Sequence, residues 1–299
     1  MKKVFLLVAA VAFAAFMTTN LFAHEKDAPK GVNHVIWIGA DGFGAHYTKW
    51  EELPNLAKMK ENGSWTLHMR SVLPSVSAIN WETMIVGAPS EMHGFRTWGS
   101  KEPDLQPIYK GENGRYPDIF SVLKAQKPDA KTAAAYDWDG IGFLFDKNAV
   151  DDNQCVKDTE AVLATFLKQL EAKPTYAFAY FGEPDHIGHN IGWGTPEYQA
   201  SLVNVDRCVG IILDKLEELG MKDDTIVYFT SDHGGSEKGH GEARMDHMEV
   251  PFVVYGPGIA VGEITDVVAN FDCAATAAWL LGLQRPQAWR GLPTYSIAK

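Results

Sequence analysis

The chain alternates between short, continuously apolar segments and longer segments in which apolar residues recur at helical spacing. Apolar runs of strand length occupy His34–Ala40, Thr132–Trp138, Thr175–Phe181, Thr225–Phe229 and Val250–Tyr255. Strands that are apolar throughout, rather than alternating, are typical of a sheet that is buried on both faces. The pattern therefore predicts an α/β fold in which helices cover both faces of a mostly parallel sheet.

Helical periodicity occupies much of the sequence between these strands. The longest predicted helix, Pro196–Leu219, has apolar residues at helical spacing and is followed by Gly220, a common residue just past a helix end. Shorter helices are predicted at Asn55–Asn62, Trp81–Val86, Tyr116–Ala125 and Cys155–Glu171. No internal repeat and no Ser/Gly-rich linker divides the chain. We therefore expect residues 24–299 to form a single domain.

The first 23 residues have a pattern of their own. Lys2 and Lys3 precede the apolar run Val4–Phe16, and the segment ends in Leu21-Phe22-Ala23, with a small residue before His24. This three-part layout is typical of a secretory signal peptide, and the run is too short to cross a bilayer. We expect cleavage after Ala23, export to the periplasm or exterior of a bacterium, and no stable membrane insertion afterwards. An uncleaved N-terminal anchor is the alternative.

Export would permit disulfides, but the chain has only three cysteines. An odd number leaves at least one thiol free. Cys155 and Cys208 both fall in predicted helices and could pair, whereas Cys273 lies in an apolar run and is predicted to be buried. The fold must therefore depend on its hydrophobic core rather than on cross-links.

The charge balance excludes one class of partner. Lys plus Arg number 27 against 38 Asp plus Glu, which gives a net charge of -11. Nothing in this balance offsets the repulsion of nucleic-acid phosphates, so we expect no nucleic-acid partner. An acidic protein that acts on anionic phosphates would need metal cations to reverse the local charge.

Acidic residues follow three of the predicted strands. Asp41 follows the first strand, Asp185 comes shortly after the third, and Asp232 with His233 follows the fourth. Taken singly, each is an ordinary turn residue. Because ligands bind beyond the carboxyl ends of parallel strands, these side chains are expected to converge.

Two further histidines, His189 and His240, complete a set of three aspartates and three histidines. Carboxylate and imidazole ligands suit zinc. Six ligands are too many for one tetrahedral ion and divide naturally into two groups of three. Two zinc ions a few Å apart can hold both the attacking and the leaving oxygens of an in-line displacement. The sequence thus predicts two zinc ions per chain.

A hydroxyl nucleophile is available in the segment Pro74–Asn80. The helical pattern that follows places Ser77 near a helix N-terminus, where backbone N–H groups favour a bound phosphate. Coordination to zinc makes a hydroxyl nucleophilic at neutral pH. The alternative is that Ser77 only caps the helix.

Together these residues resemble the alkaline phosphatase superfamily, and most closely its type I phosphodiesterase/nucleotide pyrophosphatase family. The resemblance runs from about His34 to Gly258. Its motifs follow the family's order: Asp41-Gly42, Pro54-Asn55-Leu56, Pro74-Ser75-x-Ser77 with Gly87, His93-Gly94, Glu183-Pro184-Asp185-x-x-Gly188-His189, Ser231-Asp232-His233-Gly234, His240-Gly241, and Met248 to Gly256-Pro257.

The resemblance implies an alkaline phosphatase-like three-layer sandwich and a role for each motif residue. Asp185, His189 and His240 would hold one zinc ion. Asp41, Asp232 and His233 would hold the other, with Ser77 bound to it as the nucleophile. Tyr180 would line the substrate site. His186 and His247 are weaker ligand candidates, because their positions depart from the family's spacing.

The sequence departs from the family's pattern at four places. Ser77 stands where this family usually has Thr, and Ala78 where nucleotide-cleaving members usually have an aromatic residue. Trp98 stands where an Asn usually binds a phosphoryl oxygen, and we expect it to contact the substrate as an apolar wall. Asn80 or Arg96 is a candidate replacement for the missing hydrogen-bond donor. His240 follows His233 by only seven residues, without the usual insertion. Nucleotide pyrophosphatase activity in the narrow sense is therefore not expected.

We thus expect an exported two-zinc hydrolase of small phosphate esters that acts through a phosphoserine intermediate. A formylglycine sulfatase is excluded, because the residues after Ser77 lack the required Pro and Arg. Two alternatives remain: a transferase that passes a phosphoryl substituent to another acceptor, and a metal-binding protein of the same fold without turnover.

Overall fold

The structure, a computed structural model, describes residues 26–111 and 113–299. The predicted signal peptide lies outside the described residues. One mixed sheet crosses the described chain in the order β4-β3-β5-β1-β6-β7-β2-β8. The strands are β1 (His34–Ala40), β2 (Ser64–Arg70), β3 (Thr132–Tyr136), β4 (Asp152–Cys155), β5 (Tyr176–Phe181), β6 (Thr225–Thr230), β7 (Glu249–Tyr255) and β8 (Gly262–Glu263).

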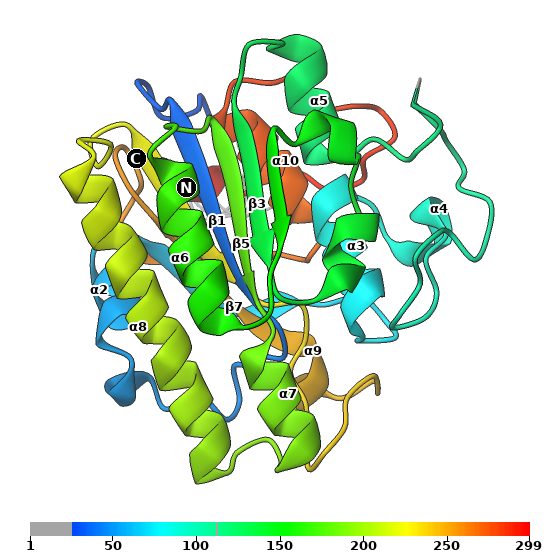
Figure 1. The fold of residues 1–299 in the computed structure, drawn as a ribbon, viewed down its shortest axis with the longest axis vertical. Coiled ribbons are helices and arrows are strands. Elements are labelled where there is room, and N and C mark those ends of the chain that lie inside the picture. Colours follow the sequence, from blue (N-terminus) through cyan, green and yellow to red (C-terminus); the bar gives the residue numbers. More distant parts are fainter. Residues whose placement is uncertain (1–25, 112) are drawn as a thin grey trace, which may run out of the picture.

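Helices pack on both faces of this sheet and give a three-layer sandwich (Figure 1). One face carries α2 (Pro54–Glu61), α6 (Thr159–Leu170) and α8 (Pro196–Glu218), and the other carries α3 (Ser77–Val86), α5 (Ile119–Gln126) and α10 (Asp272–Leu280). The shorter helices are α4 (Ser90–His93), α7 (Glu183–Asn190) and α9 (Met245–Met248). Among the described residues, no helix combines the length and the apolar character that crossing a bilayer requires.

The predicted α/β architecture is confirmed, and β1 shows why its sequence is apolar throughout. Val35 and Trp37 face the core beneath α3, α5 and α10, whereas Ile36 and Ile38 face the core beneath α2, α6 and α8. β1 pairs in parallel with β5 and with β6, so that it lies in the middle of the sheet. Only β7 runs antiparallel to its neighbours among the described strands.

Some local predictions differ from the structure. The helix predicted to start at Cys155 begins only at Thr159, because the Asp158 carboxylate accepts a hydrogen bond from the Ala161 N–H (2.9 Å) and caps α6 there. Cys155 instead ends strand β4 and is exposed, while Cys208 is buried in α8. All three cysteines are free thiols, so Cys155 and Cys208 are not paired. Strand β2 was not predicted, because its apolar residues alternate with polar ones and form no continuous apolar run like those of the predicted strands.

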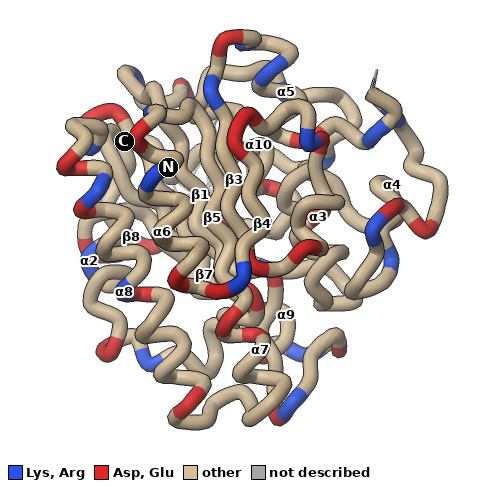
Figure 2. The backbone as a smooth tube through the Cα atoms, in the orientation of Figure 1, with Lys and Arg blue, Asp and Glu red and all other residues tan. Residues whose placement is uncertain are grey.

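The parallel strands β3, β5, β1 and β6 all end at the same edge of the sheet, toward α7 (Figure 1). Acidic positions gather around these strand ends, on a chain whose net charge is already negative (Figure 2). The topology therefore brings residues that are far apart in the sequence to one edge of the sheet, as ligand sites in open α/β sheets require.

Candidate active site

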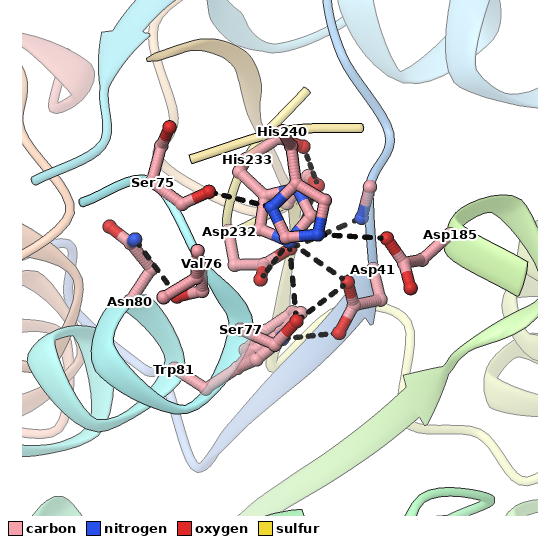
Figure 3. Close-up of polar contacts among 12 residues, drawn as sticks. Asp41, Ser75, Val76, Ser77, Asn80, Trp81, Asp185, Asp232, His233 and His240 are labelled. Atoms are coloured by element: carbon pink, nitrogen blue, oxygen red, sulfur yellow. Dashed lines mark hydrogen bonds and ion pairs between the residues drawn. The ribbon is translucent and has the colours of Figure 1, made fainter. Parts of the chain in front are cut away.

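A cavity of about 470 Å³ opens beyond the carboxyl ends of β1 and β5. The described residues that line it are Asp41, Val76, Ser77, Trp98, Trp138, Tyr180, Asp185, His186, His189 and His240. Asp232 and His233 are fully buried and adjoin Asp41 (Figure 3). The structure thus brings together all six of the predicted metal-ligand residues and the predicted nucleophile.

The first group of candidate ligands is Asp185, His189 and His240. Helix α7 places Asp185 and His189 four residues apart and therefore on one face. Asp185 Oδ1 lies 3.5 Å from His189 Nε2 and 3.7 Å from His240 Nε2, and the two Nε2 atoms lie 3.0 Å apart. One ligand atom from each residue falls within 4.8 Å of the others, so a single ion could contact all three.

The second group surrounds His233. Its Nε2 lies 3.2 Å from Asp232 Oδ2 and 3.4 Å from Asp41 Oδ1. Asp185 is also within 4.8 Å of the ligand atoms of Asp41 and His233, so it stands between the two groups. The rings of His233 and His240 stack with centroids 3.7 Å apart, which sets the two groups side by side.

The tautomers of the three histidines follow from their outer hydrogen bonds. Nδ1 faces a backbone carbonyl in each ring: Lys238 O for His189 (3.0 Å), Gly234 O for His233 (2.9 Å) and Ser75 O for His240 (2.8 Å). A carbonyl oxygen only accepts, so the proton of each neutral ring is assigned to Nδ1. Nε2 then presents its lone pair to the site, as in metal-binding histidines.

Two buried carboxylate oxygens at the same place have no donor. Asp185 Oδ1 and Asp232 Oδ2 accept no hydrogen bond from any described residue, although both face histidine Nε2 atoms. With both carboxylates ionised and the ring protons on Nδ1, lone pairs on oxygen and nitrogen point at one another. A buried polar atom without a partner is costly, and a cation between these atoms removes that cost. Nitrogen and carboxylate donors in this number suit zinc.

The electrostatics of the site point the same way. Burial lowers the pKa of His233 and of His240 to about 3, so both rings are neutral and able to bind a metal at neutral pH. Burial, together with the charge of Asp41, raises the pKa of Asp185 and of Asp232 well above the usual range. No Lys or Arg is among the described residues that line the cavity. Positive charge from bound cations would offset the repulsion among the carboxylates of Asp41, Asp185 and Asp232.

Ser77 is the first residue of α3, and Val76 occupies the cap position. The Ser77 Oγ lies 3.2 Å from His233 Nε2 and 3.5 Å from Asp41 Oδ1, and Ser77 lines the cavity (Figure 3). The alternative that Ser77 caps the helix is wrong, because its hydroxyl faces the candidate ligands instead. Its position fits that of a nucleophile.

Tyr180 lines the cavity, as predicted for a substrate contact, but its hydroxyl is also hydrogen-bonded to Asp41. It donates a hydrogen bond to Asp41 Oδ2 (2.6 Å), and the Trp81 indole donates to the same oxygen (2.9 Å). These bonds oppose the effect of burial, which raises the pKa of Asp41. The other oxygen, Oδ1, is thereby left to face His233 and Ser77.

The other two predicted substrate contacts differ in outcome. Trp98 lies at the cavity and is 68% exposed. Asn80 does not line the cavity: its amide is fully buried and bonds to the backbone of Val72, Pro74 and Val76. The Asn80 prediction therefore disagrees with the structure, because this side chain shapes the Ser77 loop rather than facing a ligand.

Three residues that line the cavity were not predicted to do so from the sequence. Trp138 follows β3, so the same rule about strand ends could have found it. Val76 directly precedes the nucleophile. His186 lines the cavity but belongs to neither ligand group. His247 is also outside both groups: its ring bonds to Ser236 Oγ (2.7 Å) and to the Glu242 N–H (3.2 Å), and so closes the loop that carries His240.

Comparison with known proteins agrees with this geometry. A family model described as type I phosphodiesterase/nucleotide pyrophosphatase matches residues 35–250, from β1 to the start of β7. The chain belongs to this family. The match includes every candidate ligand and Ser77, and it confirms the resemblance inferred from the motifs.

Named relatives within the family are longer than this chain. Ectonucleotide pyrophosphatase/phosphodiesterase family member 1 of Mus musculus is 28% identical over an alignment of 272 positions, which covers 81% of this chain and 29% of that protein. A venom phosphodiesterase of Naja atra is 25% identical over an alignment of 225 positions, which covers 70% of this chain and 27% of that protein. The chain thus spans less than a third of the length of either relative.

A solved structure shares the fold. An inactive variant of murine ectonucleotide pyrophosphatase/phosphodiesterase 5, in complex with AMP, matches with a TM-score of 0.72 and 15% identity. The match covers 89% of this chain and 100% of that chain. At this identity the likeness shows the alkaline phosphatase-like fold.

Proposed function

We propose that this protein is an exported, zinc-dependent hydrolase of phosphate esters with Ser77 as its nucleophile. The observation that carries the proposal is the convergence of unprotonated histidine nitrogens and donorless carboxylate oxygens around the Ser77 hydroxyl. Membership in a family of phosphodiesterases supports the same reaction class. A site that only bound metal would not need a buried hydroxyl aimed at the ligands.

Two zinc ions fit the donor set. Asp185, His189 and His240 would hold one, and the group around His233, with Asp41 and Asp232, would hold the other. When bound, zinc supplies the positive charge that lowers the pKa of a hydroxyl and neutralises phosphoryl oxygens. The outer hydrogen bonds of the three histidines fix their rings for this role.

The residues of this chain then account for the steps at phosphorus. Ser77 Oγ forms a bond to phosphorus while the bond from phosphorus to the leaving alcohol oxygen breaks, which leaves a phosphoserine. Water then attacks the same phosphorus and releases Ser77 with its hydroxyl restored. Catalysis of this kind is mainly positioning and charge neutralisation, and the buried N-terminus of α3 supplies the positioning.

The cavity favours a small ester as substrate. Beside the nucleophile stand the rings of Trp98, Trp138 and Tyr180, and no basic side chain is among the described lining residues. The relatives' printed names include nucleotide pyrophosphatase and phosphodiesterase, and one related structure contains AMP. Phosphate esters with an apolar leaving group are the class that this lining accommodates.

Export rests on the N-terminal sequence pattern, with residues 24–299 as a single catalytic domain. N-terminal sequencing of the protein recovered from the periplasm or the medium tests this part. A mature chain that starts at His24 is expected. Retention of Met1 in a membrane fraction would contradict export by a cleaved signal.

The test of the activity uses mono- and bis-p-nitrophenyl phosphate with purified protein, with and without a chelator. We expect hydrolysis that the chelator abolishes and that added zinc restores. Zinc binding without hydrolysis of either ester would favour the alternative of a metal-binding protein. Release of p-nitrophenol with transfer to an added alcohol in place of water would favour the transferase.

A further inference from the structure

Helix α7 carries two candidate ligands, yet its N-terminus lacks the usual cap. The cap residue is Gly182, which has no side chain, and Asp185 is the third residue of the helix. A polar side chain at this third position ordinarily turns back and accepts the N–H of the cap residue, in a capping box. Helix α5 of the same chain has that arrangement, with Ser121 Oγ accepting the Asp118 N–H at 3.2 Å.

The Asp185 side chain does not accept the N–H of the cap residue Gly182. Its Oδ1 is buried, accepts no hydrogen bond from any described residue, and faces His189 and His240. The Gly182 N–H instead donates to Oδ1 of Asp137, at 2.9 Å. The carboxylate of Asp137, which directly follows β3, therefore takes the place that Asp185 would have in a capping box.

The sheet and a glycine together make this contact possible. β3 and β5 are parallel with Tyr136 opposite Tyr180, so Asp137, the next residue after β3, lies beside the start of α7. Gly182 leaves room for it, since a Cβ at that position would lie 3.0 Å from Asp137 Oδ1. A carboxylate at a helix N-terminus is also favoured by the helix dipole.

We propose that Asp137 is a positioning residue: by accepting the Gly182 N–H, it leaves the Asp185 carboxylate free to bind a metal ion with His189 and His240. This inference rests on the proposed metal-dependent function and adds a residue outside both ligand groups. Without Asp137, the Gly182 N–H lacks its acceptor and the Asp185 side chain is the nearest replacement in the same helix.

The test measures zinc affinity by competition with a chromophoric chelator, on the full mature chain made metal-free. Asp137→Ala should weaken one of the two zinc ions by about 10- to 100-fold, the usual effect of losing a group that orients a ligand, and leave the other unchanged. Asp137→Asn keeps an oxygen acceptor and should stay within about threefold of wild type. Gly182→Ala, which crowds the contact while keeping every carboxylate, should weaken the same ion.

Asp158→Ala is the matched control, because Asp158 also accepts a backbone N–H at a helix start, on α6, which carries no ligand. It should lower the melting temperature without changing zinc affinity. If Asp137→Ala binds both ions as wild type does, or if Asp137→Asn loses one ion as Asp137→Ala does, the proposal is wrong. Failure of the wild type to bind zinc would instead overturn the proposed function.

Discussion

The Tyr180 hydroxyl donates a hydrogen bond of 2.6 Å to Oδ2 of Asp41, which directly follows the neighbouring strand β1. With the Trp81 indole on the same oxygen, it fixes the Asp41 carboxylate so that Oδ1 faces His233 and Ser77. The tyrosine that the family resemblance assigns to the substrate thus also orients a candidate metal ligand.

Tyr180→Phe should therefore weaken metal binding at the group around His233 and lower kcat. The ring still fills its place, but Asp41 Oδ2 keeps only the Trp81 donor. Loss of a group that orients a ligand usually costs about 10- to 100-fold in affinity or activity. Zinc competition and steady-state kinetics measure the two effects.

The control for this variant is Tyr176→Phe on the same strand. Tyr176 is equally buried, but its hydroxyl bonds to that of Tyr228 (2.9 Å), away from the ligands. Activity equal to wild type is expected for Tyr176→Phe. Equal activity of Tyr180→Phe would show that this bond does not orient Asp41.

Ser77→Ala should abolish turnover while the fold and the zinc content stay close to wild type. The hydroxyl would be one metal ligand added to Asp41, Asp232 and His233, and water could take its place. If the variant keeps more than about a tenth of wild-type kcat, the loss is under roughly 1.4 kcal/mol, which is too little for a nucleophile. Ser71→Ala, a buried serine bonded to Met248 O, serves as the control.

The sequence predicted the ligands because their placement follows from simple rules. Asp41, Asp185 and Asp232 each come after an apolar strand, and parallel strands end at one edge. The hydrogen bonds that orient these ligands could not be predicted by such rules. Whether Asp137 meets Gly182 depends on how β3 pairs with β5, which the sequence does not state.

Asn80 was predicted to contact the substrate, and this prediction was wrong. Its place one helical turn after Ser77 makes it a reasonable phosphoryl donor by sequence alone. The amide instead bonds to backbone groups of residues 72–76, because the loop before α3 leaves buried polar groups that need partners. The side chain satisfies the loop and is not free for a ligand.

Nucleotide esters should be little preferred over simple aryl phosphate esters. Trp81 and Trp138 flank the Tyr180 ring, with centroids at 5.2 and 6.2 Å, and Ala78 is buried in the core rather than at the cavity. A base stacked on Tyr180 therefore lacks the aromatic partner that nucleotide-cleaving members usually have at the position of Ala78, a contact worth about 1–3 kcal/mol.

Comparing kcat/KM for a p-nitrophenyl nucleotide ester and the matched non-nucleotide diester tests this specificity. Values within about tenfold of each other are expected. A preference for the nucleotide of about a hundredfold, roughly 2.7 kcal/mol of transition-state discrimination, would reveal a base pocket.

The stability of the metal-free protein should depend on pH through Asp137. Burial raises the pKa of this carboxyl to about 6, above its ordinary 3.8, so the folded state favours the neutral acid. Wild type should therefore lose stability relative to Asp137→Asn as the pH rises from about 4 to about 6, by up to about 3 kcal/mol, with no further change above that range.

Urea unfolding of both proteins with chelator present, from about pH 4 to about pH 8, measures this difference. A stability difference that stays constant across the range would mean that the Asp137 carboxyl titrates normally. A difference that grows toward acid pH would reverse the sign and contradict the account.

The most direct test of a zinc-dependent phosphate ester hydrolase is a zinc titration of the metal-free protein, followed by hydrolysis of bis-p-nitrophenyl phosphate. Activity should be absent at the start, should rise with added zinc and should level off at two equivalents per chain. Ser77→Ala should bind the same zinc and stay inactive. Full activity in the metal-free wild type, or the same activity in Ser77→Ala, would contradict the account.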